Sequence, residues 1–146
     1  MATDGTMTKI LIADDHAIVR TGVRQLLEEH GFNDVGEAAT GPAALEACLA
    51  GGWDLLLLDV TLPGRSGVDV LRDLRRDCPG LPILMVSFYL DSNYIRQCLQ
   101  AGAAGYVAKE SLPEDLVPAI QAVLTGQSYV SQAVNEALDS GPPLAA

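Results

Sequence analysis

Cysteine and basic residues are scarce in this chain of 146 residues. The three cysteines, Cys48, Cys78 and Cys98, are odd in number and form no C-x-x-C pair, which argues against a disulfide framework and against a zinc site. Lys and Arg number 9 against 19 Asp and Glu, so the net charge is −10. Such a surface repels phosphate backbones and anionic lipid heads, and we expect this segment to bind neither nucleic acid nor a membrane.

Long apolar runs and targeting signals are missing as well. No stretch approaches the roughly eighteen uninterrupted apolar residues of a membrane helix, and the N-terminal MATDGTMTKI has no basic segment leading into an apolar one. The first apolar run is followed by DDHAIVR and not by a glycine-rich turn, which excludes a dinucleotide-binding fingerprint. Together with the unpaired cysteines, these absences predict a cytoplasmic location.

The chain does contain a regular alternation of short apolar runs with longer segments whose apolar residues recur every three or four positions. Hydrophobic residues make up 49% of the chain, which is enough for a core of its own. Five βα units predict an α/β fold in which helices cover both faces of a doubly wound parallel sheet. The predicted strands are 9–13, 34–38, 55–59, 83–87 and 105–109, and the predicted helices are about 17–29, 42–50, 67–77, 92–101 and 113–125.

Polar residues stand at the ends of four predicted strands. Asp14 and Asp15 follow the first strand, Asp59 ends the third, Ser87 the fourth and Lys109 the fifth. Because parallel strands bring their carboxyl ends to one edge, where such sheets bind ligands, these side chains are expected to converge. Three neighbouring carboxylates repel one another, so the cluster predicts a divalent cation, Mg²⁺ or Mn²⁺.

This set of groups suits a phosphoryl ligand. With a cation in place, Asp59 is a nucleophilic carboxylate, Lys109 a counter-charge and Ser87 a donor to a phosphoryl oxygen. The alternatives are capping of a turn or helix by the aspartates, a solvent-exposed lysine and an ordinary turn hydroxyl. His16 is interpreted as a first-turn helix residue, with transition-metal binding as its alternative.

Four segments carry a family pattern, namely ILIADDH, LLLLDVTLPGRSG, ILMVS and AGAAGYVAKE. In this order and spacing they resemble the receiver domain of two-component response regulators, most closely its NarL/FixJ (LuxR-type) branch. The resemblance runs from about Lys9 to Thr125. It implies a flavodoxin-like strand order of 2-1-3-4-5 and a phosphorylation switch that catalyses only its own phosphorylation and autodephosphorylation.

The resemblance also implies a phosphate donor and a set of metal ligands. Asp59 would accept phosphate from a sensor histidine kinase or from a small donor such as acetyl phosphate. Asp15 and Asp59 would ligate Mg²⁺ together with the backbone carbonyl of Thr61, while Asp14 would act mainly through water.

The remaining implied roles concern the switch. Ser87 would move toward the aspartyl phosphate, Lys109 would pair with it, and Tyr106 would turn inward in the active state; static packing is the alternative for Tyr106. Phe88 stands where the wider family usually has a small residue, and we expect its ring to restrict access to the acceptor. Tyr89 occupies a position that tunes the lifetime of the family's aspartyl phosphate.

The residue at position 61 argues against a second class of protein that also uses a nucleophilic aspartate. Phosphatases of the haloacid-dehalogenase type also place a nucleophilic Asp after a hydrophobic strand, but they need a second acid two residues later as general acid and base. Here that position is Thr61, which cannot act as general acid and base. A phosphatase therefore stays an alternative that lacks the residue needed for proton transfer. In the receiver family the Thr61 position also tunes phosphate lifetime.

The C-terminal segment bears on the output. Residues 1–127 are predicted to be the receiver and 128–146 a tail with a short helix over 131–138 and a final Gly-Pro-Pro-Leu-Ala-Ala tether. The resemblance implies that a helix-turn-helix domain follows such a tail, so we expect transcriptional control through a domain absent from this sequence, with a stand-alone receiver as the alternative. Phosphorylation would reshape the face formed by the fourth helix, fifth strand and fifth helix, and a homodimer would bring two DNA-binding domains together.

Overall fold

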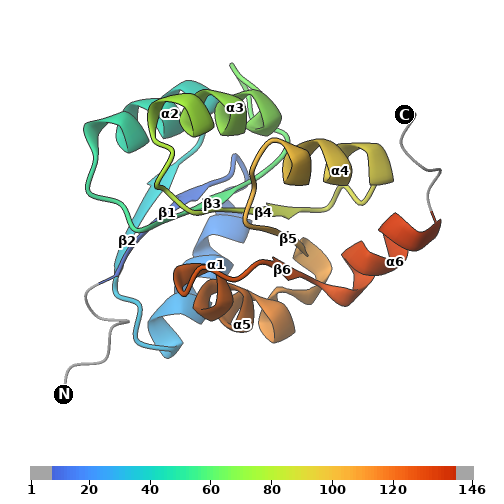
Figure 1. Cartoon of the computed structure of the whole chain (residues 1–146). Helices are drawn as coiled ribbons and strands as arrows, with labels where there is room; N and C mark the ends of the chain where they lie inside the picture. The colour runs from blue at the N-terminus through green and yellow to red at the C-terminus, as the bar shows by residue number, and fades with distance from the viewer. Residues whose placement is uncertain (1–7, 141–146) are drawn as a thin grey trace.

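A computed structural model describes residues 8–140 as a parallel sheet with helices on both faces (Figure 1). The strands lie in the order β2-β1-β3-β4-β5-β6, and every neighbouring pair is parallel. The predicted doubly wound, flavodoxin-like α/β fold is therefore confirmed, with one strand more than expected. The strands are β1 (Lys9–Ala13), β2 (Asp34–Ala38), β3 (Leu55–Leu58), β4 (Ile83–Ser87), β5 (Gly105–Ala108) and β6 (Tyr129–Val130).

The helices follow the strands and agree with the predicted ranges to within a few residues. Side-chain caps mark some of their starts, because Ser66 accepts from the Asp69 N–H and Asp91 from the Asn93 N–H. Gly102, with φ of 106°, takes the left-handed backbone that ends a helix. The helices are α1 (Ala17–Glu29), α2 (Gly41–Ala50), α3 (Gly67–Asp77), α4 (Ser92–Gln100), α5 (Leu112–Leu124) and α6 (Gln132–Ser140), with a short 3₁₀ turn at Lys109–Ser111.

The central strands are buried on both faces. β3 is a run of four leucines and β4 is buried at every position, as expected of parallel strands covered on two sides. In Figure 1, α2, α3 and α4 lie on one face of the sheet and α1 and α5 on the other. Both faces are thus closed, which leaves the carboxyl-end edge of the strands as the place for a site.

The sixth strand and the helix after it join the fold at the β5 edge. β6 has two residues, too short for hydrophobic periodicity to reveal, and the sequence did not predict it. The helix at Gln132–Ser140 lies where the sequence predicted a short one over 131–138. The predicted tether, 141–146, lies outside the described residues.

Specific contacts hold this C-terminal segment to the sheet and to α4. Val134 is fully buried, and a guanidinium N–H of Arg96 on α4 donates to the Leu138 carbonyl at 3.1 Å. The buried hydroxyl of Ser131 accepts from the Ala108 N–H at 3.2 Å, at the end of β5. Within residues 8–140, no helix combines the length and hydropathy needed to cross a bilayer.

Candidate functional site

Three strands deliver Asp14, Asp59 and Lys109 to the same edge of the sheet. Asp14 directly follows β1, Asp59 follows β3 and Lys109 follows β5. Backbone pairing continues past the strand ends, since the Asp14 N–H donates to the Ala38 carbonyl and the Asp59 N–H to the Ala13 carbonyl, each at 3.0 Å. The sheet itself therefore sets the two carboxylates side by side, as the sequence predicted.

Lys109 bridges these two carboxylates. Its Nζ lies 2.6 Å from Asp14 Oδ2 and 2.8 Å from Asp59 Oδ2. The side chains of Lys109, Asp14 and Asp59 are 2%, 5% and 2% exposed, so water screens the three charges little. The arrangement places one buried positive charge between two buried negative ones.

Burial and pairing act in opposite directions on the ionisation of this group. Burial raises the pKa of Asp59, and the hydrogen bond and charge of Lys109 offset the rise only in part. For Lys109, burial opposes the charged form, but the hydrogen bonds and charges of Asp14 and Asp59 outweigh burial and raise the pKa of the ammonium. Lys109 accordingly stays protonated at neutral pH, while the charge on Asp59 is costly to bury.

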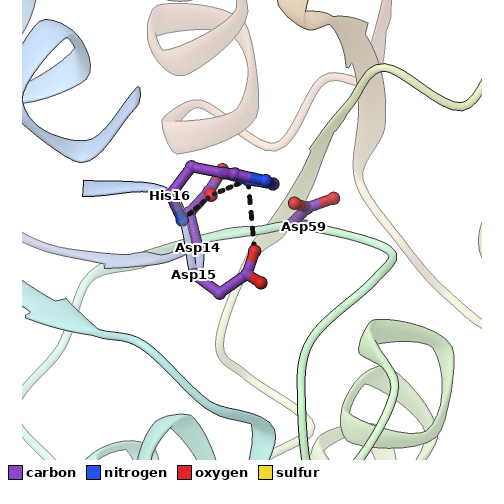
Figure 2. Close-up of side chains that lie close together, drawn as sticks. All are labelled: Asp14, Asp15, His16 and Asp59. Carbon is purple, nitrogen blue, oxygen red and sulfur yellow. Dashed lines mark hydrogen bonds and ion pairs between the residues drawn. The ribbon is translucent and has the colours of Figure 1, made fainter. Parts of the chain in front are cut away.

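Asp15 and His16 extend the cluster toward solvent, and Figure 2 shows their side chains facing Asp14 and Asp59. Asp15 is 37% exposed and His16 59% exposed at the side chain. Asp14, Asp15, His16 and Asp59 each offer one ligand atom, and these atoms lie within 4.8 Å of one another. Carboxylate oxygens are the donors that hard divalent cations take, so the donor set fits a divalent cation.

Thr61 contacts the Asp59 carboxylate, and Ser87 ends β4, the strand next to β3. The Thr61 N–H donates to Asp59 Oδ1 at 3.3 Å, and the role of its carbonyl as a metal ligand stays a prediction. Ser87 is fully buried, and its Oγ accepts from the Tyr89 N–H at 3.0 Å. The structure thus brings Thr61 to Asp59 and buries Ser87 at the same edge of the sheet, and the predicted roles of both residues stay predictions.

Tyr106 lies inside the protein. It is fully buried on β5, and its hydroxyl donates to the backbone carbonyl of Tyr89. Burial raises the pKa of the Tyr106 phenol, so it remains a neutral donor. This is the inward position that the family resemblance associates with the active state, whereas movement between two positions stays a prediction.

Phe88 and Tyr89 are exposed at the entrance to the site. Their residues are 53% and 51% exposed. The Phe88 ring centroid lies 5.1 Å from Lys109 Nζ, within the range of a cation–π contact. Tyr89 makes an edge contact with Tyr94, with ring centroids 6.2 Å apart. The Phe88 ring therefore lies over the ammonium that binds Asp59, and its predicted effect on access stays a prediction.

Sequence reasoning missed the residues that hold the end of β1. Arg20 on α1 donates through its Nη1 to the Asp14 carbonyl at 2.7 Å and through its Nε to Glu37 Oε1 at 2.8 Å. Glu37 also pairs with Arg24, and the two arginines lower the pKa of Glu37. The only sequence signal was the position of Arg20 in the first turn of the helix predicted over 17–29, six residues after Asp14.

Comparison with known proteins identifies the pattern. A family model of the response regulator receiver domain matches residues 10–121. The response regulator UvrY of Escherichia coli O6:H1 (strain CFT073) is 36% identical over 126 residues, which cover 86% of this chain and 58% of UvrY. The chain thus spans about three fifths of the length of the curated relatives it matches.

Solved structures give the same match. A crystal structure of a LuxR-family two-component response regulator from Aurantimonas sp. SI85-9A1 superposes with a TM-score of 0.84 at 35% identity, over 90% of this chain and 94% of that one. RcsB from Salmonella enterica serovar Typhimurium, bound to promoter P1flhDC in the presence of the phosphomimetic BeF3⁻, superposes with a TM-score of 0.83 at 26% identity, over 90% and 66%.

Proposed function

The chain belongs to the response regulator receiver family of two-component systems, in its NarL/FixJ (LuxR-type) branch, and from this we propose that Asp59 is its phosphoacceptor. The observation that carries the proposal is the bridge from Lys109 to Asp59 and Asp14 at the end of the central strand. If Asp59 served only to cap the turn after β3, it would need neither a buried ammonium nor a second carboxylate beside it. A phosphoryl acceptor needs both a counter-charge and a cation site.

The proposed reaction moves a phosphoryl group from a histidine kinase, or from acetyl phosphate, to Asp59. A carboxylate oxygen of Asp59 forms the new bond to phosphorus while the bond to the kinase imidazole nitrogen, or to the acetate oxygen, breaks. The leaving group keeps the electron pair of that bond, and the imidazole takes up a proton. Asp15, Asp59 and the Thr61 carbonyl would hold a divalent cation, Mg²⁺ or Mn²⁺, with Asp14 acting mainly through water, and the bound cation would neutralise phosphoryl charge.

The residues around Asp59 then respond to the added charge. A phosphoryl group brings about one further negative charge and three strong acceptor oxygens, which compete with Asp14 for Lys109. Ser87 turns its hydroxyl to a phosphoryl oxygen and gives up the Tyr89 N–H, at the turn where Tyr106 is also bound. The arrangements with and without the phosphoryl group are two states of the same residues, and phosphorylation shifts the equilibrium between them. The change extends to the surface formed by α4, β5 and α5.

We propose transcriptional control as the output. RcsB, with 26% identity, is described bound to a promoter, and we extend that activity to the full-length form of this protein through a DNA-binding domain after the receiver. The net charge of −10 argues against DNA contact by the receiver itself. Its direct partners are then a sensor histidine kinase and a second receiver, and its chemistry is limited to its own phosphorylation and autodephosphorylation.

Mass spectrometry after incubation with acetyl phosphate and Mg²⁺ tests the proposal. We expect one added phosphoryl group that hydroxylamine removes, because an acyl phosphate reacts with this nucleophile. Asp59→Asn should remain unlabelled, while Asp54→Asn, an aspartate at the opposite end of β3, should be labelled like the wild type. Undiminished labelling of Asp59→Asn would overturn the assignment.

A further inference from the structure

The imidazole of His16 faces the acid cluster from the solvent side. Its Nδ1 lies 3.2 Å from Asp14 Oδ1 and 3.2 Å from Asp15 Oδ1, and Figure 2 shows the ring turned toward both carboxylates. His16 precedes α1, yet its side chain makes no capping hydrogen bond to the helix. Its orientation is therefore explained by the carboxylates and not by the helix start.

The separations between these atoms match those between neighbouring ligands of one cation. Metal–nitrogen and metal–oxygen bonds are about 2.0–2.2 Å, so adjacent ligands are roughly 3.0 Å apart in an octahedral shell and 3.4 Å in a tetrahedral one. The two separations of 3.2 Å from His16 Nδ1 fall between these values. The nitrogen is thus at the spacing of a neighbouring ligand from each of the two oxygens, and without a cation it is in hydrogen-bond contact with Asp14 Oδ1.

Lys109 does not bind the Asp14 oxygen that faces His16. It binds Oδ2 of Asp14 and Oδ2 of Asp59, whereas the oxygen of Asp14 that faces His16 is Oδ1. The two Asp14 oxygens therefore have different partners: Oδ2 binds the buried ammonium, while Oδ1 accepts from the His16 backbone N–H at 2.8 Å and faces the His16 ring. The ammonium and a cation on the His16 side do not compete for the same oxygen.

We infer that His16 is a nitrogen ligand of the cation site, and that the receiver binds borderline first-row cations such as Mn²⁺, Co²⁺ and Zn²⁺ through it. The inference rests on the proposed function, because it concerns the cation site of the same phosphoacceptor. Neutral imidazole suits these cations, while Mg²⁺ takes oxygen ligands and keeps several waters. His16 therefore favours the borderline cations over Mg²⁺ at a site whose carboxylates accept both.

The test compares untagged wild type with His16→Ala, and uses His30→Ala as the matched control. His30 is the other histidine of the chain, and its Nδ1 contacts the Leu26 carbonyl at the far end of α1. Affinities for Mg²⁺ and Co²⁺ are measured by titration calorimetry, and Mn²⁺-loaded protein is examined by electron spin echo spectroscopy for coupling to an imidazole nitrogen. Thermal melting without metal confirms that each variant is folded.

We expect His16→Ala to weaken Co²⁺ binding by about tenfold or more, to change Mg²⁺ affinity less than about twofold and to abolish the nitrogen coupling. His30→Ala should match the wild type in all three measurements. Equal weakening of Mg²⁺ and Co²⁺, or a nitrogen coupling absent from the wild type, would overturn the inference while leaving the proposed function intact. Wild type that binds Co²⁺ and shows the nitrogen coupling with Mn²⁺, but binds no Mg²⁺, would support the inference and contradict the Mg²⁺-dependent reaction.

Discussion

Lys109 Nζ lies between two carboxylates, 2.6 Å from Asp14 Oδ2 and 2.8 Å from Asp59 Oδ2, although 50 residues of chain separate Lys109 from Asp59. Two negative charges thus share one positive charge in a place that water scarcely reaches. The two carboxylates and the ammonium together carry an excess negative charge, which a bound cation or a proton neutralises. The stability of the fold and the chemistry of the site are therefore coupled through the same three side chains.

Replacing the ammonium tests this coupling. Lys109→Met leaves Asp14 and Asp59 buried without their counter-charge, and we expect it to lower the free energy of unfolding by about 3–5 kcal/mol in metal-free buffer. Urea denaturation measures the loss. The double variant Lys109→Met with Asp59→Asn should recover a large part of it, because only one buried carboxylate then remains. A loss below about 1 kcal/mol for the single variant would mean that the bridge contributes little.

Removing the charge of Asp59 should stabilise the metal-free protein at neutral pH. Burial raises the pKa of Asp59 in the folded state, so the folded protein holds this proton more tightly than the unfolded chain does. The associated stability is complete below the ordinary carboxyl pKa of about 3.9 and is lost as pH rises through the raised folded value. Asp59→Asn escapes that loss and should gain on the order of 1 kcal/mol at pH 7.

Thermal melts between pH 4 and pH 8 check the sign. The advantage of Asp59→Asn over the wild type should shrink toward pH 4 and grow toward pH 7. An advantage that grows as pH falls would show that pairing with Lys109, and not burial, dominates the ionisation of Asp59.

A divalent cation should stabilise the wild type. Mg²⁺ at about ten times its dissociation constant adds about 1.4 kcal/mol to the free energy of unfolding if it binds only the folded state. Asp15→Ala should abolish this gain because Asp15 contributes a carboxylate to the cluster. Asp34→Ala, at an exposed position on β2, is the matched control and should respond to Mg²⁺ like the wild type. Melting with and without EDTA measures the difference.

Phe88 should slow phosphorylation by small donors. Its ring lies over Lys109 at 5.1 Å, beside the acceptor, and Phe88→Ala is expected to speed labelling by acetyl phosphate several-fold. Phe88→Leu keeps much of the bulk and removes the cation–π contact, so it should label nearly as slowly as the wild type if the effect is steric. Slower labelling of Phe88→Ala would contradict the idea of a gate.

Much of the fold and the core of the site follow from sequence alone. The apolar runs of β3 and of β4 up to Val86 are unambiguous because parallel strands are buried on both faces, and an aspartate after such a run has to lie at the sheet edge. Strand order then brings Asp14, Asp59 and Lys109 together. These features depend on backbone topology, which the hydrophobic pattern determines.

The remaining features depend on side-chain conformation and on short-range packing. The sequence predicted Lys109 as a partner of a phosphoryl group, whereas the structure has it bound to both carboxylates, a choice of rotamer that no periodicity reveals. The inward position of Tyr106 likewise depends on the Tyr89 carbonyl being free to accept its hydroxyl. β6 consists of two residues, and only its pairing with β5 identifies it as a strand.

The parallel sheet has a consequence for the order of events during synthesis. Each strand pairs with another only after the chain between them has crossed over the sheet, so neither contact of Lys109 with the two carboxylates is local. Lys109 follows the fifth strand and leaves the ribosome after both carboxylates that it binds. A nascent chain therefore exposes Asp59 for some time without its ammonium, and acquires a complete site only when β5 has docked beside β4.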